Sequence, residues 1–171
     1  TLIAPDVVLT AAHCVDEGTL TFGMGSVENL DMRWTTQSDL SSWDGSDMNV
    51  PWPDDAVSAW DWVAHPGYDM NDFDIGLAEN DDLALIFLDT PIFDFPHAYL
   101  PTEGLGSQLT EGDEVIIVGW GQQSATSQWE APPAGSFAIK QQAISDISEL
   151  GSSEFQVGQN ESDARKCHGD S

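Results

Sequence analysis

Three side chains that together can hydrolyse an acyl bond lie far apart in this sequence: His13, Asp82 and Ser171. A serine hydroxyl is a weak nucleophile at neutral pH unless a neighbouring base accepts its proton, and histidine is the usual base. A carboxylate beside the histidine holds the imidazole in the tautomer that accepts that proton. His13 follows the apolar run "VVLTAA", Asp82 begins "DLALIFL", and Ser171 ends "CHGDS".

Each of these residues also has a simpler explanation. A histidine after a strand is more often structural than catalytic, and an aspartate at a strand entry is usually a turn residue. The assignment of a site therefore depends on the elements that would bring the three residues together.

Short apolar or alternating segments bounded by Gly, Pro, Asp or Asn indicate strands, so we expect an all-β fold. An alternative for residues 144–155, "ISDISELGSSEF", is a turn or two of helix. The predicted strands are "DVVLTAA" (6–12), "TLTFGM" (19–24), "DLALIFL" (82–88), "DEVIIVGW" (113–120) and "FAIKQQAISDI" (137–147).

The length of 171 residues and the hydrophobic content of 40% suit one domain or two small subdomains with a real core. A polar, glycine-containing stretch at residues 101–113 predicts a linker, which gives an N-terminal β-barrel at 1–105 and a partial C-terminal barrel at 106–171. Residues 29–56 lack periodicity and indicate an acidic surface insertion.

The charge balance is extreme, with 30 Asp and Glu against 4 Lys and Arg and a net charge of -26. This field repels nucleic acid and anionic membranes, so we expect neither as a partner. No run approaches the 18 apolar residues of a membrane span. A solvated acidic surface explains the charge, and a high-salt habitat or divalent cation binding are the alternatives.

Four blocks occur in one order along the chain: "VLTAAHCV" (8–15), "NDDLALIFLDTPI" (80–92), "VIIVGWG" (115–121) and "CHGDS" (167–171). With softer matches such as "AHPGYD" (64–69), they make the chain resemble the chymotrypsin-like (trypsin-like) serine endopeptidases over essentially its whole length. The resemblance implies two antiparallel six-stranded Greek-key barrels, the second incomplete in this chain. It also implies a secreted hydrolase that acts on proteins or peptides.

Carried over by this resemblance, Ser171 is the nucleophile, His13 the general base and Asp82 the orienter of His13. Asp81 is excluded because the orienter directly precedes the apolar "LALI" run. Gly169 and Ser171 would supply the backbone N–H groups of the oxyanion hole. Asp170 would pair with the new N-terminal ammonium after zymogen cleavage.

The position six residues before the nucleophile is Arg165, followed by Lys166, where an aspartate would select basic substrates in this family. Arg165 either faces a substrate Glu or Asp in the specificity pocket or turns to solvent and pairs with Asp163 or Glu161. Both alternatives stay open.

Family members continue beyond both ends of this sequence, so the resemblance implies a fragment that is inactive by itself. It also implies that Cys14 and Cys167 pair with cysteines outside the 171 residues, and a bridge between the two is the alternative. A non-catalytic homologue that serves as a scaffold is the second hypothesis for function. It conflicts with the presence of all three triad residues.

No cofactor is expected. Calcium is an alternative at "DMNDFD" (69–74) because calcium prefers oxygen ligands. Tryptophans in and after the insertion either anchor loops and core or form an exosite. The sequence leaves the oligomeric state open.

Overall fold

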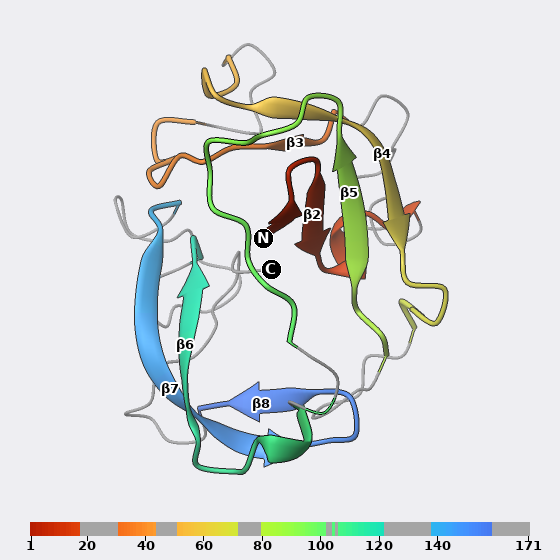
Figure 1. Ribbon diagram of the computed structural model, residues 1–171, viewed down its shortest axis with the longest axis vertical. Coiled ribbons are helices and arrows are strands. Elements are labelled where there is room, and N and C mark those ends of the chain that lie inside the picture. The colour runs from red at the N-terminus through yellow and green to blue at the C-terminus, as the bar shows by residue number, and fades with distance from the viewer. Residues whose placement is uncertain are drawn as a thin grey trace. The chain divides into compact units, whose positions relative to one another are not determined.

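The computed structural model describes residues 1–17, 31–43, 51–71, 80–101, 104, 106–121 and 138–158. Within these residues lie eight strands and two single-turn 3-10 helices, so the predicted all-β fold is confirmed (Figure 1). They divide into two units, residues 1–36 with 55–108, and residues 37–54 with 109–171. The domain division at residues 105 and 106 stays a prediction.

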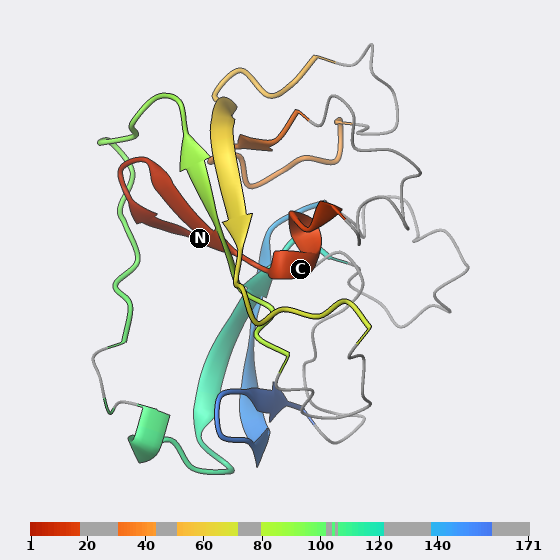
Figure 2. The ribbon, with the colours of Figure 1, turned by 90° about the vertical axis from the view of Figure 1, so that its right-hand side faces the viewer.

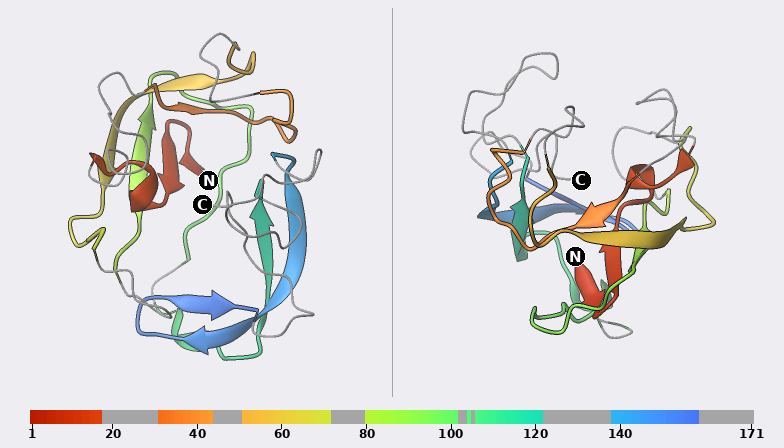
Figure 3. Two further views of the ribbon diagram at one scale, coloured as in Figure 1. Left: turned by 180° about the vertical axis from the view of Figure 1, so that it is seen from behind. Right: turned by 90° about the horizontal axis from the view of Figure 1, so that it is seen from above.

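The first unit is a curled, antiparallel five-stranded sheet, whose curl is visible in Figures 1 and 3. In sheet order its strands are β1 (Leu2–Ala4), β2 (Val7–Thr10), β5 (Ala84–Leu88), β4 (Val57–Ala64) and β3 (Arg33–Trp34). Between β2 and the rest of the chain the backbone forms η1 (Ala12–Cys14).

The core of this unit lies on one face of β5, where Ala84, Ile86 and Leu88 are buried and the residues between them are partly exposed. This alternation follows from the two-residue period of a strand. Burying a side chain such as Ile86 contributes about 1.5–3 kcal/mol. These side chains belong to a cluster that also contains Leu2, Val8, Ala12 and Val15.

The second unit contains a three-stranded antiparallel sheet in the order β6 (Glu114–Gly119), β7 (Gln141–Leu150) and β8 (Phe155–Val157), seen from the side in Figure 2. Glu114 pairs with Asp146 and Gly119 with Gln141, so β6 is matched along its whole length. The short helix η2 (Gly106–Gln108) lies within the stretch predicted as a linker.

The helical alternative for residues 144–155 is wrong. β7 continues to Leu150 and β8 starts at Phe155, and Ile147 pairs with Val157 across the two strands. Pairing with β6 on one side and β8 on the other satisfies the backbone of β7 and outweighs any local helical tendency.

Sequence analysis did not predict β4, and it placed the end of β2 too far along the chain. β4 is partly exposed on both faces, so its residues show no simple alternation. The strand predicted at 6–12 ends at Thr10 because the chain turns into η1. The strand predicted at 19–24 lies outside the described residues, and the predicted insertion contains β3.

Candidate active site

His13 lies in the single turn η1, directly after β2 (Figure 2). Its neighbours Ala12 and Val15 are buried in the core, and the Val15 N–H donates to the Ala12 carbonyl at 2.9 Å. The core therefore anchors the turn on both sides of His13. The imidazole itself is only partly buried, with 30% of its side chain exposed.

Asp82 reaches His13 because β2 and β5 are neighbouring antiparallel strands. Thr10, the last residue of β2, pairs with Ala84, the first residue of β5. The residues that follow β2 and those that precede β5 therefore lie at the same end of the ladder. His13 and Asp82 are 69 positions apart in the chain and meet there.

The carboxylate of Asp82 contacts His13 twice. Asp82 Oδ2 lies 2.7 Å from His13 Nδ1, and Asp82 Oδ1 accepts the backbone N–H of His13 at 2.9 Å. An ionised carboxylate only accepts hydrogen bonds, so Nδ1 must carry the proton in this pair. In the neutral ring, Nε2 is then the acceptor, which is the form that a general base requires.

The adjacent Asp81 faces a different histidine. Its Oδ2 lies 3.5 Å from Nδ1 of His65, which follows β4. Asp81 has a left-handed backbone, with φ of 54°, and its carbonyl accepts the Leu83 N–H at 2.6 Å. Two consecutive aspartates thus point to two histidines, and it is Asp82 that contacts His13.

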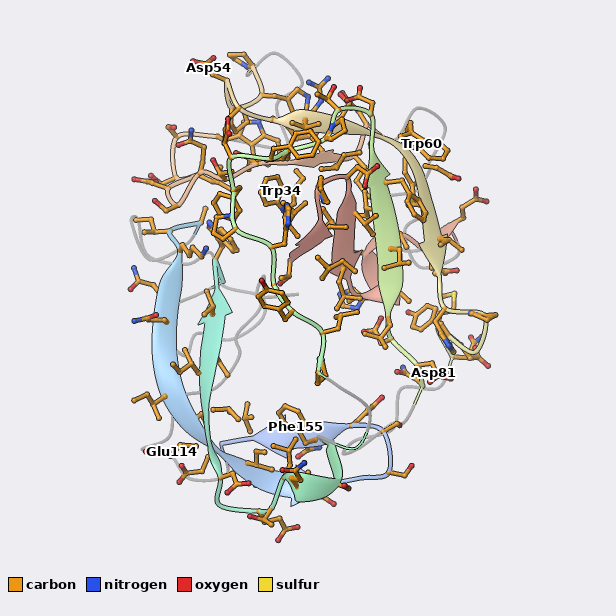
Figure 4. The ribbon with its side chains drawn as sticks, viewed as in Figure 1. Trp34, Asp54, Trp60, Asp81, Glu114 and Phe155 are labelled. Atoms are coloured by element: carbon orange, nitrogen blue, oxygen red, sulfur yellow. The ribbon has the colours of Figure 1, made fainter. Side chains whose placement is uncertain are left out.

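The turn that carries His65 also supports the segment before β5. The His65 N–H donates to the Leu83 carbonyl at 2.7 Å, and the Gly67 N–H donates to His65 Nδ1 at 3.2 Å. Figure 4 labels Asp81 on the segment that enters β5. The stretch "AHPGYD" contributed only to the family resemblance, and sequence analysis assigned His65 no role. The signal available was its position in a block that precedes the paired aspartates Asp81 and Asp82.

The other site residues predicted from the sequence lie outside the described residues. These are the nucleophile and oxyanion-hole donor Ser171 with Gly169, Asp170, Arg165, Lys166 and Cys167. The structure therefore brings together two members of the predicted triad, His13 and Asp82, and describes no position for the third. The pairing of Cys14 and Cys167 stays a prediction.

In the part of the chain that the structure describes, no three His, Cys, Asp or Glu side chains gather where they could hold a metal ion. Asp69, the first residue of the calcium alternative, accepts the backbone and side-chain N–H of Asn71, both at 2.9 Å. These bonds lower the pKa of Asp69. Residues 72–74 of that stretch lie outside the described residues.

No described helix is long and apolar enough to cross a membrane.

In hydrolases that use a serine nucleophile, a carboxylate that contacts an imidazole in this way orients the general base. The family model for trypsin matches this chain over residues 1–171. The chain belongs to the trypsin family of serine proteases.

One relative is the CLIP domain-containing serine protease HP8 of Bombyx mori, which is 33% identical over 131 residues. The match covers 74% of this chain but only 34% of the relative, so the chain spans well under half of that protein.

Proposed function

We propose that this chain carries the catalytic site of a serine endopeptidase, which hydrolyses peptide bonds through an acyl-enzyme intermediate. The observation that supports this most is the double contact between Asp82 and His13, at 2.7 Å and 2.9 Å. A carboxylate that binds both the ring and the backbone of one histidine restricts how the ring turns and presents Nε2 as a base.

In the proposed reaction, His13 Nε2 accepts the proton of the Ser171 hydroxyl while Ser171 Oγ bonds to the scissile carbonyl carbon. His13 then donates that proton to the leaving nitrogen, and the C–N bond breaks to leave an ester on Ser171. Water attacks the ester carbon with His13 again as base, the bond from that carbon to Ser171 Oγ breaks to release the acid product, and His13 returns the proton to Ser171 Oγ. Asp82 stays ionised throughout and stabilises the imidazolium.

The tetrahedral intermediates carry a negative charge on the former carbonyl oxygen. We assign its stabilisation to the backbone N–H groups of Gly169 and Ser171, a contribution of about 3 kcal/mol for each donor in such sites. Asp170 would shape this loop by pairing with an N-terminal ammonium. Its side chain takes no direct part in the chemistry.

The substrates we propose are proteins or peptides in an extracellular compartment. An extracellular setting would suit the disulfides predicted for Cys14 and Cys167, since disulfides persist where the environment is oxidising. Nucleic acids and anionic membranes are disfavoured as partners by the net charge of -26. The proposed chemistry needs no cofactor.

A fluorophosphonate probe, which reacts with an activated serine, tests this proposal. In the natural full-length protein after activation, we expect the probe on Ser171, no labelling of Ser171→Ala, and strongly reduced labelling of folded His13→Ala. If the folded wild-type protein is not labelled, the site is not an active serine hydrolase and the scaffold hypothesis takes its place.

A further inference from the structure

A pocket in the second unit has no role in the proposed catalysis. It has a volume of about 430 Å³, which is within the usual range for sites that bind a small ligand or a side chain. Figure 4 labels Asp54, one of the residues that line it. Residues that line it include two tryptophans, two prolines and two carboxylates, namely Trp43, Trp52, Pro51, Pro53, Asp39 and Asp54.

The segment that carries one side of the pocket is fixed to a neighbouring backbone. Asp39 forms a β-bridge with Ile139, and the Leu40 N–H donates to the Ala138 carbonyl at 2.8 Å. The Lys140 N–H donates to the Ser38 carbonyl at 2.7 Å. Residues 38–40 are therefore held in place before any ligand arrives.

Both ends of residues 37–54 are also tied together. Asp55 accepts the Thr35 hydroxyl at 2.6 Å and the Thr36 N–H at 2.8 Å, and it also accepts the Thr36 hydroxyl. The residues that precede and follow this segment are thus joined through one carboxylate. A pre-formed pocket loses less entropy on binding than one that must be ordered.

The tryptophans supply a large aromatic surface. The rings of Trp43 and Trp52 are stacked, with centroids 4.8 Å apart and planes at 29°. Tryptophan attracts cations more strongly than other aromatic residues. The same unit already shows such a contact, because the ammonium of Lys140 lies 4.9 Å from the centre of the Trp120 ring.

The charge of the pocket has one sign. Asp39 and Asp54 line it, none of its described lining residues is basic, and neither carboxylate forms an ion pair with a described residue. Hydrogen bonds from the Ser41 hydroxyl and then from the Ser41 N–H lower the pKa of Asp39 below its ordinary value of 3.8. Asp39 is therefore ionised at neutral pH.

From the aromatic surface and the carboxylates together, we propose that this pocket binds an arginine side chain in a basic segment of a protein ligand. A guanidinium is planar, so it stacks on an indole ring and offers paired N–H donors to a carboxylate. A neutral sugar also stacks on tryptophan but gains nothing from the charge, and an anion is repelled by it.

None of the residues that line this pocket is assigned a part in the hydrolytic chemistry, but its proposed use as an exosite for a protein substrate rests on the proposed function. The binding test is therefore made with the Ser171→Ala protein, which binds without cleavage. Its result does not depend on whether the wild-type protein hydrolyses peptides.

The probe is a labelled hexapeptide, acetyl-Gly-Arg-Gly-Gly-Arg-Gly amide, compared with the same peptide in which neutral citrulline replaces arginine. The assay is run at 0.15 M salt, where the Debye length of about 8 Å limits attraction to the acidic surface in general. Fluorescence anisotropy should show that the arginine peptide binds at least about tenfold more tightly than the citrulline peptide. Trp52→Ala should weaken this binding about tenfold, and Trp52→Phe should retain most of it.

Two matched control variants distinguish binding in the pocket from attraction to the acidic surface in general. Trp60→Ala removes an exposed tryptophan of the first unit, and Asp94→Asn removes an exposed charge there. We expect Asp54→Asn to weaken binding several-fold while both controls bind like the parent protein. Equal effects of Asp54→Asn and Asp94→Asn, no effect of Trp52→Ala in a folded protein, or equal binding of the citrulline peptide would each overturn the proposal.

Discussion

The carboxylate of Asp81 lies directly against Gly67: a Cβ placed on Gly67 would collide with Asp81 Oδ2. The same carboxylate is 3.5 Å from His65 Nδ1, and the backbone of Asp81 is left-handed. Asp82, which holds His13, is the next residue. The absence of a side chain at residue 67 therefore leaves room for the Asp81 carboxylate beside the residue that orients His13.

Replacing Gly67 with alanine should lower catalytic efficiency without contacting substrate. The new methyl group displaces the Asp81 carboxylate, the end of a side chain that is 44% exposed, and ends its approach to His65 Nδ1. We expect kcat/KM to fall only about two- to fivefold, because the side chain can turn away while the backbone that carries Asp82 stays nearly in place. Steady-state kinetics measures the loss, and circular dichroism checks that the fold is retained.

The matched control is the double variant Gly67→Ala with Asp81→Gly. Glycine at residue 81 removes the obstructing carboxylate and accepts the positive φ of 54° without strain. It should restore most of the lost activity. Wild-type activity in the single variant, or no recovery in the double one, would show that Gly67 does not act through Asp81.

Cleavage after Lys or Arg should be poor, because the residue six before the nucleophile is Arg165 and not an acid. A cationic pocket floor repels a cationic substrate side chain. A peptide library assayed with the wild-type protein and with Arg165→Ser also separates the two open alternatives for Arg165. If Arg165 faces the substrate, a preference for Glu or Asp disappears in the variant, and if it faces solvent the profile is unchanged. Efficient tryptic cleavage is the result that this reasoning does not allow.

Salt should stabilise the protein. With a net charge of -26, mutual repulsion favours expanded states, and salt screens it as the Debye length falls from about 30 Å at 0.01 M to about 3 Å at 1 M. Tm should therefore rise between these NaCl concentrations, as scanning calorimetry can measure. A Tm that does not change with NaCl concentration but rises with micromolar calcium would point to a specific calcium site instead.

Much of this arrangement can be predicted from local patterns. The continuous apolar run "LALIFL" marks β5, and the apolar run before His13 marks β2, so the two strands next to His13 and Asp82 follow from the sequence. Their meeting across 69 positions came from the family resemblance, since no local pattern encodes which strands pair.

The contacts that sequence analysis missed depend on tertiary structure. The contact of Asp81 with His65 and Gly67 is made by a turn after β4, a strand whose partly exposed faces give no clear period. The stacking of Trp43 on Trp52 is likewise a relation between residues without periodicity. Sequence analysis left two alternatives open for those tryptophans, which were loop anchors or an exosite. The pocket that they line is the basis of the peptide-binding test.

The most direct test of the proposed catalytic role is to compare Asp82→Asn with Asp81→Asn in the activated, full-length protein. Asparagine at 82 offers an amide where His13 Nδ1–H needs an acceptor, so kcat should fall about 10⁴-fold while substrate binding changes little. Asparagine at 81 tolerates the left-handed backbone and should leave kcat within about threefold of wild type. A wild-type kcat in Asp82→Asn, or an equal loss in both variants, would contradict the assignment of Asp82 as the residue that orients His13.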